Sequence, residues 1–355
     1  MTSVAEAMRP LHTSNTGQGL RALFLLVLSL WLASCSPSVQ VYSFGGPTMG
    51  TSWEVTLAEL PSGVRVKQLR TDIEVLLTTI NQQMSTYIDD SDISRFNQAG
   101  PETWHAVPPD FARVLEAALA LSHASGGAFD PTVGPLVNLW GFGPTGRRDQ
   151  APPAAEREAA RARVGWQRLQ WDAAHQRLLQ PGGVYLDFSA IAKGYAVDRV
   201  GEYLSGQGVD AWLVDIGGEV RTRGRKADGE PWRIAVERPL AGTREINTVV
   251  RPGDMAMATS GDYRNFFEDN GHSFSHTIDP RTAEPVNHRL ASVTVLHPSC
   301  MQADGLATLL TVLGPEEGMA FAARHNLAVL LIVREEDGFR ELMTDSFRRY
   351  TEDTD

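Results

Sequence analysis

The sequence predicts a mixed α+β fold in which strands and helices do not alternate strictly. Residues 53–57 alternate between apolar and polar side chains, as expected for a strand. Apolar side chains recur at helical spacing over residues 69–84, which predicts an amphipathic helix. Residues 184–216 then follow the order strand, helix, strand. Such a mixture, without a regular strand-helix repeat, is typical of α+β and mixed α/β domains.

The remaining elements follow from local signals. We expect, in order, a helix at 91–97 capped by Ser91, a helix at 111–122 stopped by Gly126-Gly127, a solvated excursion at 144–163, a strand at 184–188, a helix at 190–204, strands at 211–216, 233–237 and 292–296, a helix at 301–313, and another helix before a closing strand at 327–333. The 355 residues suffice for one catalytic domain of two intimately packed subdomains.

An apolar run at residues 22–33 follows the basic residues Arg9 and Arg21. About a dozen helical residues, rising ~1.5 Å each, cannot cross a hydrocarbon core of ~30 Å. The run therefore indicates the apolar region of a signal peptide.

The run ends in Leu-Ala-Ser-Cys at residues 32–35. Small residues before a cysteine at this point are typical of a bacterial lipoprotein signal, so we expect Cys35 to be lipidated. The alternative is a buried cysteine in an ordinary signal peptide. The expected organisation is a signal peptide at 1–34, the lipidated cysteine and a tether at 35–44, and a catalytic domain at 45–355.

Net charge, cysteine count and motif spacing argue against a nucleic-acid-binding protein, a disulfide-stabilised fold, a zinc site and two common nucleotide-binding folds. A net charge of −11 argues against a nucleic-acid partner. Lipidation of Cys35 would leave Cys300 alone, so no intramolecular disulfide is expected. The histidines lack zinc-site spacing, and neither a Walker loop nor a Rossmann glycine motif is present.

The first chemically informative cluster is the expected strand-to-helix junction at residues 186–194. Free backbone N–H groups at a helix N-terminus, with Lys193 in the first turn, favour an anion such as phosphate. The structural alternative is that Asp187 or Ser189 only caps the helix and that Lys193 is solvated. This segment alone leaves both interpretations open.

The second cluster lies on the expected helix at 301–313. Asp304 and Thr308 are four residues apart, so their oxygens project from one face. Carboxylate, hydroxyl and carbonyl oxygens form the set that Mg²⁺ prefers. Taken alone, a solvated Asp304 is the better explanation of the pattern, and the metal site gains support only from the other clusters.

Two further clusters combine polar residues with turns. Residues 256–263 end an apolar stretch in Thr-Ser-Gly, which can bind a phosphate or form a plain turn. Residues 274–282 lead a short strand into an Asp-Pro turn. His276, within this segment, is a general base or a structural histidine.

Together and in this order, the clusters resemble the ApbE family of FAD:protein FMN transferases. The resemblance covers nearly the whole chain after the tether. It is carried by the segments 45–51, 84–97, 127–131, 139–143, 187–194 and 217–218, and by the Thr-Ser-Gly, His…Asp-Pro-Arg and Ala-Asp…Ala-Thr clusters. The chain departs from the commonest family pattern at Glu219, Thr277 and Ala283.

The resemblance implies roles for particular residues. The implied FAD site is lined by Met49, Tyr87, Ala128, Phe129, Asp130, Asp187, Lys193 and Ile278. The implied Mg²⁺ site consists of the carbonyls of Ala190 and Ala307 and the side chains of Asp304 and Thr308. His276 is the candidate for the general base.

The implied reaction moves FMN from FAD to a threonine or serine hydroxyl of a client flavoprotein, with Mg²⁺ bound and AMP released. The implied clients are flavoprotein subunits of ion-pumping membrane redox complexes, of the NADH:quinone oxidoreductase or Rnf type. A lipid anchor on the periplasmic side of the inner membrane suits such clients, and Ser36 after Cys35 leaves sorting to the outer membrane open.

Two alternatives remain from the sequence. One is an FAD pyrophosphatase that uses water as nucleophile and yields FMN and AMP. The other is a lipoprotein that only binds flavin; Asp304 and Thr308 argue against it, because holding FAD requires no pair of metal ligands.

Overall fold

The computed structural model describes residues 41–148, 150–240, 242, 245–261, 266–269 and 272–351. The expected signal peptide and Cys35 lie outside these residues. Val41–Asp355 forms one compact unit, and within its described part no helix is long and apolar enough to cross a membrane.

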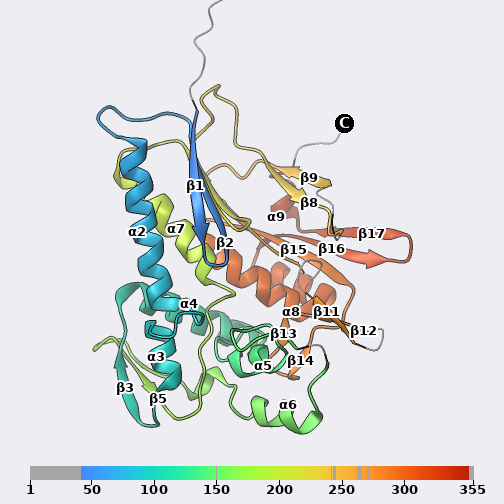
Figure 1. Ribbon diagram of the computed structural model, residues 1–355. Helices are drawn as coiled ribbons and strands as arrows, with labels where there is room; N and C mark the ends of the chain where they lie inside the picture. Colours follow the sequence, from blue (N-terminus) through green and yellow to red (C-terminus); the bar gives the residue numbers. More distant parts are fainter. Residues whose placement is uncertain are drawn as a thin grey trace, which may run out of the picture. The chain divides into compact units, whose positions relative to one another are not determined.

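The unit is organised around an eight-stranded sheet (Figure 1) in which every neighbouring pair is antiparallel. In spatial order, its strands are β1 (Tyr42–Thr48), β2 (Thr51–Leu57), β6 (Trp212–Ile216), β7 (Glu219–Arg223), β10 (Ala256–Gly261), β15 (Leu290–His297), β16 (Ala328–Glu335) and β17 (Gly338–Met343). Together with the helices below, this sheet confirms the mixed α+β prediction. Tyr42 to Phe44, which the sequence assigns to the tether, are part of β1.

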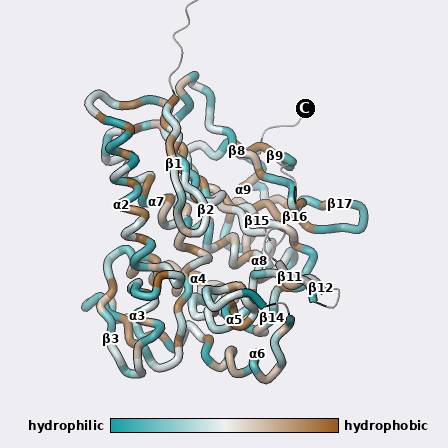
Figure 2. Tube along the Cα trace, in the orientation of Figure 1, coloured by the Kyte–Doolittle hydropathy of each residue, from teal (hydrophilic) through white to brown (hydrophobic). Residues whose placement is uncertain are grey.

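The described helices are α2 (Val66–Met84), α3 (Asp92–Gln98), α4 (Pro109–Ser125), α5 (Gly134–Leu139), α6 (Ala154–Arg161), α7 (Ala192–Gly206), α8 (Cys300–Arg324) and α9 (Asp345–Arg348), with a 3₁₀ turn at Trp166–Arg168. Helices α2, α7, α8 and α9 contact this sheet, and the others pack farther from it. Both α7 and α8 contact the sheet and each other, while α2 and α4 pack outside them. Figure 2 shows polar and apolar residues alternating along α2, which buries only one face.

Strand β16 is apolar on both faces because both of its faces are covered. In β16, Val329 and Leu331 join the core beneath the helices, whereas Leu330 and Ile332 pack with Phe347 of α9 on the other face. Continuous burial of this kind explains the unbroken apolar run that the sequence shows there. The sequence did not indicate β17 or α9, which follow this strand.

Short strands form four smaller sheets. They are β3 (Thr103–Ala106) with β5 (Arg177–Gln180) and β4 (Gln170–Asp172), β8 (Ile234–Glu237) with β9 (Ile246–Val250), β11 (Phe266–Asp269) with β12 (His272–Ser275), and β13 (Ile278–Asp279) with β14 (Glu284–Pro285).

The prediction of a strand at 184–188 is wrong. The alternation is real, because Val184, Leu186 and Phe188 are buried, but these residues pair with no strand. Side chains take the place of a strand partner: Asn97 donates to the carbonyl of Leu186 at 2.9 Å and accepts from its N–H at 2.7 Å. Gln180 makes the same two contacts with Val184. Periodicity reports burial, and it cannot show which groups satisfy the backbone.

Candidate active site

The large sheet opens between β7 and β10, and a cavity of about 730 Å³ lies at this opening. The two strands pair only through Ala256 and Met257. Beyond that point β10 continues along β15 alone, so Thr259 and Ser260 line the cavity opposite the Gly217-Gly218 turn. The volume is in the range of small-molecule sites, roughly 300–1,000 Å³.

The structure brings nearly all of the expected site residues to this one cavity. They are Met49, Tyr87, Ala128, Phe129, Asp130, Asp187, Ala190, Lys193, His276, Ile278, Asp304 and Thr308. Ala307 is the exception: it is buried, does not line the cavity, and its carbonyl accepts the hydroxyl of Thr311 at 2.8 Å. Sequence reasoning missed several other lining residues, including Val137, Phe142 and Asp215.

One side of the cavity is apolar and aromatic. Met49 reaches it from the β1–β2 hairpin, where Met49 and Gly50 both have positive φ (48° and 72°), the backbone of a tight hairpin turn. Tyr87 is 66% exposed despite its size, so its ring is available to a ligand. The ring of Phe142 meets His276 edge-on, with centroids 6.3 Å apart. A flat aromatic ligand suits this wall.

Two expected acidic residues have local partners. Asp130 accepts hydrogen bonds from the N–H and hydroxyl of Thr132 and from the N–H of Trp166. Burial raises the pKa of its carboxyl group, and these hydrogen bonds oppose that shift. Asp187 accepts from the N–H and hydroxyl of Ser189, at 2.8 and 2.6 Å. It therefore shapes the turn before α7 and is not the helix cap.

The N-terminus of α7 faces a carboxylate from another helix. Its N-cap position is Ile191, which makes no capping side-chain hydrogen bond. Instead, the N–H of Gly194 donates to Oδ2 of Asp304 at 2.9 Å. The sequence predicts an anion at this helix end. For the N–H group of Gly194, that anion is the carboxylate of Asp304.

Three charged side chains meet beside this contact. The ammonium group of Lys193 lies 2.5 Å from Oε1 of Glu219, and the Glu219 side chain is only 5% exposed. Burial raises the pKa of Glu219 to about 7, although Lys193 acts in the opposite direction. Burial lowers the pKa of Lys193, but Asp304 and Glu219 outweigh it and hold that pKa above its usual value. Burial likewise raises the pKa of Asp304.

The oxygen atoms here suit a hard cation. Asp304 and Thr308 both line the cavity, one turn apart on α8, and Ala190 lines it at the start of α7. The described chain has no group of three or more His, Cys, Asp or Glu residues that could hold a metal ion. A magnesium ion would therefore depend on one carboxylate and neutral oxygens. Oε2 of Glu219, which is buried without a hydrogen-bond partner among the described residues, is a further acceptor nearby.

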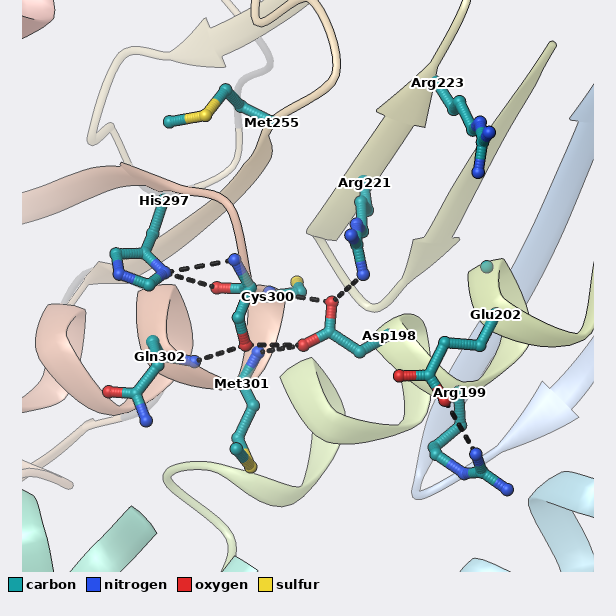
Figure 3. Close-up of polar contacts among 12 residues, drawn as sticks. Asp198, Arg199, Glu202, Arg221, Arg223, Met255, His297, Cys300, Met301 and Gln302 are labelled. Carbon is teal, nitrogen blue, oxygen red and sulfur yellow. Dashed lines mark hydrogen bonds and ion pairs between the residues drawn. The ribbon is translucent and has the colours of Figure 1, made fainter. Parts of the chain in front are cut away.

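A residue that the sequence analysis did not single out fixes the start of α8 (Figure 3). Asp198 of α7 accepts hydrogen bonds from the hydroxyl of Ser299 at 2.7 Å and from the N–H groups of Cys300 and Met301 at 2.9 and 3.0 Å. Arg221 of β7 pairs with the same carboxylate at 2.7 Å. Helical spacing gave no signal for it, because Asp198 lies two residues from both Ala196 and Val200 and therefore on the other side of the helix from the expected apolar face.

Comparison with known proteins agrees with this geometry. The model of the ApbE family matches residues 49–331. The FAD:protein FMN transferase of Vibrio cholerae is 46% identical over 328 residues, covering 92% of this chain and 98% of its own length. That of Haemophilus influenzae is 40% identical, covering 94% of this chain and 98% of its own.

Solved structures give the same result. The flavin transferase ApbE from Vibrio cholerae superposes with a TM-score of 0.82 at 45% identity, covering 88% of this chain and 99% of its own. The apo form of the Pseudomonas stutzeri flavinyl transferase ApbE gives 0.81 at 43% identity, covering 88% and 96%.

Proposed function

This chain belongs to the ApbE family and is an FAD:protein FMN transferase, and we propose that the cavity between β7 and β10 performs the transfer with Mg²⁺, onto a threonine or serine hydroxyl, releasing AMP. The observation that carries this proposal is the meeting of Asp304, Thr308 and Lys193 in the same cavity as the aromatic wall. Binding and activating a diphosphate requires a cation site and a positive charge, which Asp304, Thr308 and Lys193 would supply. The aromatic wall suits the flavin ring.

The proposed reaction is a substitution at phosphorus. The client hydroxyl oxygen forms a bond to the FMN-side phosphorus, the bridging P–O bond of the FAD diphosphate breaks, and AMP leaves with the bonding pair. The hydroxyl proton passes to a base, for which His276 is the candidate because it lines the cavity. When bound, Mg²⁺ neutralises charge that develops on the phosphate oxygens.

The chain's own residues orient the diphosphate. Lys193, whose side chain is 30% exposed, presents a fixed positive charge to the cavity because Glu219 restrains its ammonium group. A positioned cation stabilises developing negative charge without reorganising during the reaction. The isoalloxazine ring would be held by Met49, Tyr87, Phe129 and Ile278. The diphosphate would then lie at the N-terminal ends of α7 and α8.

We further propose that Cys35 carries a lipid anchor, which would hold the enzyme on the periplasmic side of the inner membrane. The motif at residues 32–35 supports the anchor, and the expected clients favour the inner membrane over the outer membrane that Ser36 leaves open. The expected clients, flavoprotein subunits of ion-pumping redox complexes, would share that surface.

The decisive test replaces Asp304 by Asn, which keeps the shape and removes the charge that offsets the cation. FMN transfer to a threonine-containing client peptide, measured by mass spectrometry at low Mg²⁺, should fall by about two orders of magnitude, while FAD binding is largely retained. Asp345→Asn is the matched control, because Asp345 is 97% exposed at the start of α9. Transfer at the wild-type rate by Asp304→Asn would contradict the proposed metal site. Release of FMN and AMP without peptide labelling would indicate the hydrolase instead.

A further inference from the structure

Glu219 has a carboxylate oxygen that is left without a hydrogen-bond partner by the part of the chain that the structure describes. One oxygen, Oε1, is held by Lys193 at 2.5 Å. The other, Oε2, is buried and has no hydrogen-bond partner among the described residues. A buried, unsatisfied oxygen of an ionisable group is costly, and native proteins rarely keep one without a function. Glu219 lines the cavity, so this buried oxygen belongs to a side chain at the edge of the proposed binding site.

The local charges indicate what that ligand carries. Lys193 is one cation, and it is shared by two buried carboxylates, Glu219 and Asp304, both of which raise its pKa. The described cluster therefore holds one more acidic group than basic groups. Burial raises the pKa of both carboxyl groups, and a cation bound beside them would oppose this shift by stabilising their ionised forms.

The position of Glu219 is fixed by the strand that carries it. Residues 219 and 221 of β7 point to the same face, because side chains alternate along a strand. Arg221 pairs with Asp198 on α7, and Glu219 pairs with Lys193 on the same helix. The two pairs hold β7 against α7, which restrains the Glu219 carboxylate beside the start of α8.

We propose that Glu219 is a positioning residue of the magnesium site, with Oε2 accepting a hydrogen bond from a water molecule bound to the ion. The inference depends on the proposed function, which places Mg²⁺ at Asp304 and Thr308. Mg²⁺ usually keeps several of its waters in protein sites. Acceptors that orient the ligands of a metal typically change its affinity by about 10–100-fold.

Mg²⁺ titration of the whole chain by calorimetry, without FAD, tests the assignment independently of activity. Glu219→Gln should weaken Mg²⁺ binding by at least about tenfold. Lys193→Met should strengthen it, because it removes the competing positive charge. Glu202→Gln is the matched control on α7, because Glu202 pairs with Arg199 at the surface; the Mg²⁺ affinity of this variant should equal that of the wild type.

Glu219→Asp separates the hydrogen bond from the charge. It keeps the charge but withdraws the carboxylate by one methylene group, so Mg²⁺ affinity should fall if Oε2 must reach a water molecule. Wild-type affinity in a folded Glu219→Asp protein, verified by its melting temperature, would overturn the proposal. The Glu219→Asp measurement also tests the proposal if Glu219→Gln does not fold. Asp304→Asn, titrated in parallel, separates the proposed metal site from the proposed role of Glu219. If the wild type and Asp304→Asn bind Mg²⁺ equally, or if neither binds it, the proposed metal site is wrong. If Asp304→Asn loses Mg²⁺ binding and the Glu219 variants do not, only the role of Glu219 is wrong.

Discussion

Gly194 of α7 packs directly against the start of α8, and its replacement by alanine gives a sharp prediction. A Cβ atom at this position would lie 2.3 Å from the carbonyl oxygen of Cys300 and 2.7 Å from Cβ of Asp304. Ordinary contact begins at 3.4 Å, so the shortest contact is about 1.1 Å too close. The clash is with backbone, which cannot rotate away, so α8 must move away from α7.

Two consequences follow for Gly194→Ala. Overpacking costs about 1–3 kcal/mol, and the upper end applies because backbone is involved. Alanine recovers up to about 1 kcal/mol of helix propensity, so the free energy of unfolding should fall by about 2 kcal/mol. A displacement of about 1 Å at Asp304 should also reduce FMN transfer by about 10²-fold, because catalytic geometry tolerates little misplacement.

Gly206→Ala on the same helix is the control. No atom lies within 4 Å of its added Cβ, so this change should stabilise the protein by about 0.5–1 kcal/mol and leave transfer unchanged. Chemical denaturation measures the stabilities, and flavin fluorescence of the labelled client measures transfer. Wild-type transfer by a folded Gly194→Ala protein would refute the argument that contact between the helices positions Asp304.

The other predictions concern individual proposed roles. Lys193→Ala should weaken FAD binding and slow transfer, as measured by FAD titration and turnover; unchanged values would assign Lys193 a structural role only. Thr308→Val should lose less transfer than Asp304→Asn, and excess Mg²⁺ should partly restore it, because water can replace a neutral ligand. Cys35→Ala should lack lipid and fail to partition with membranes; intact-mass analysis that finds an unmodified Cys35 in the mature wild-type chain would rule out the anchor.

The sequence predicted those parts of the fold that depend on local patterns. Helices such as α2 and α4 follow from apolar spacing, and Ser91 caps α3 by accepting from the N–H of Ser94, as expected. The order of strands in the sheet was not predictable, because pairing joins segments as distant as β2 and β6. The false strand at 184–188 shows a second limit, because side chains replace a strand partner: Asn97 comes from a distant part of the chain, and Gln180 lies four residues before Val184.

The candidate site shows a similar division. The order of the motifs along the chain allowed the site residues to be predicted. All of them that the structure describes line the cavity, except Ala307. The contribution of Glu219 could not be inferred from spacing, because it depends on a long-range pair with Lys193 and on the absence of a second partner among the described residues. Local patterns identify the types of side chain, whereas long-range packing decides which charges remain available.

The same packing explains how the site is kept rigid. Asp304 of α8 accepts the N–H of Gly194 in the first turn of α7, and Asp198 of α7 accepts the N–H groups of Cys300 and Met301 in the first turn of α8. Each helix thus satisfies the N-terminal donors of the other, and a single contact of this kind is typically worth about 1 kcal/mol. Because the contacts are reciprocal, the start of α7, with Lys193, cannot move without disturbing the start of α8, with Asp304. The proposed diphosphate site between these two helix ends would gain a fixed separation from this arrangement without relying on a flexible loop.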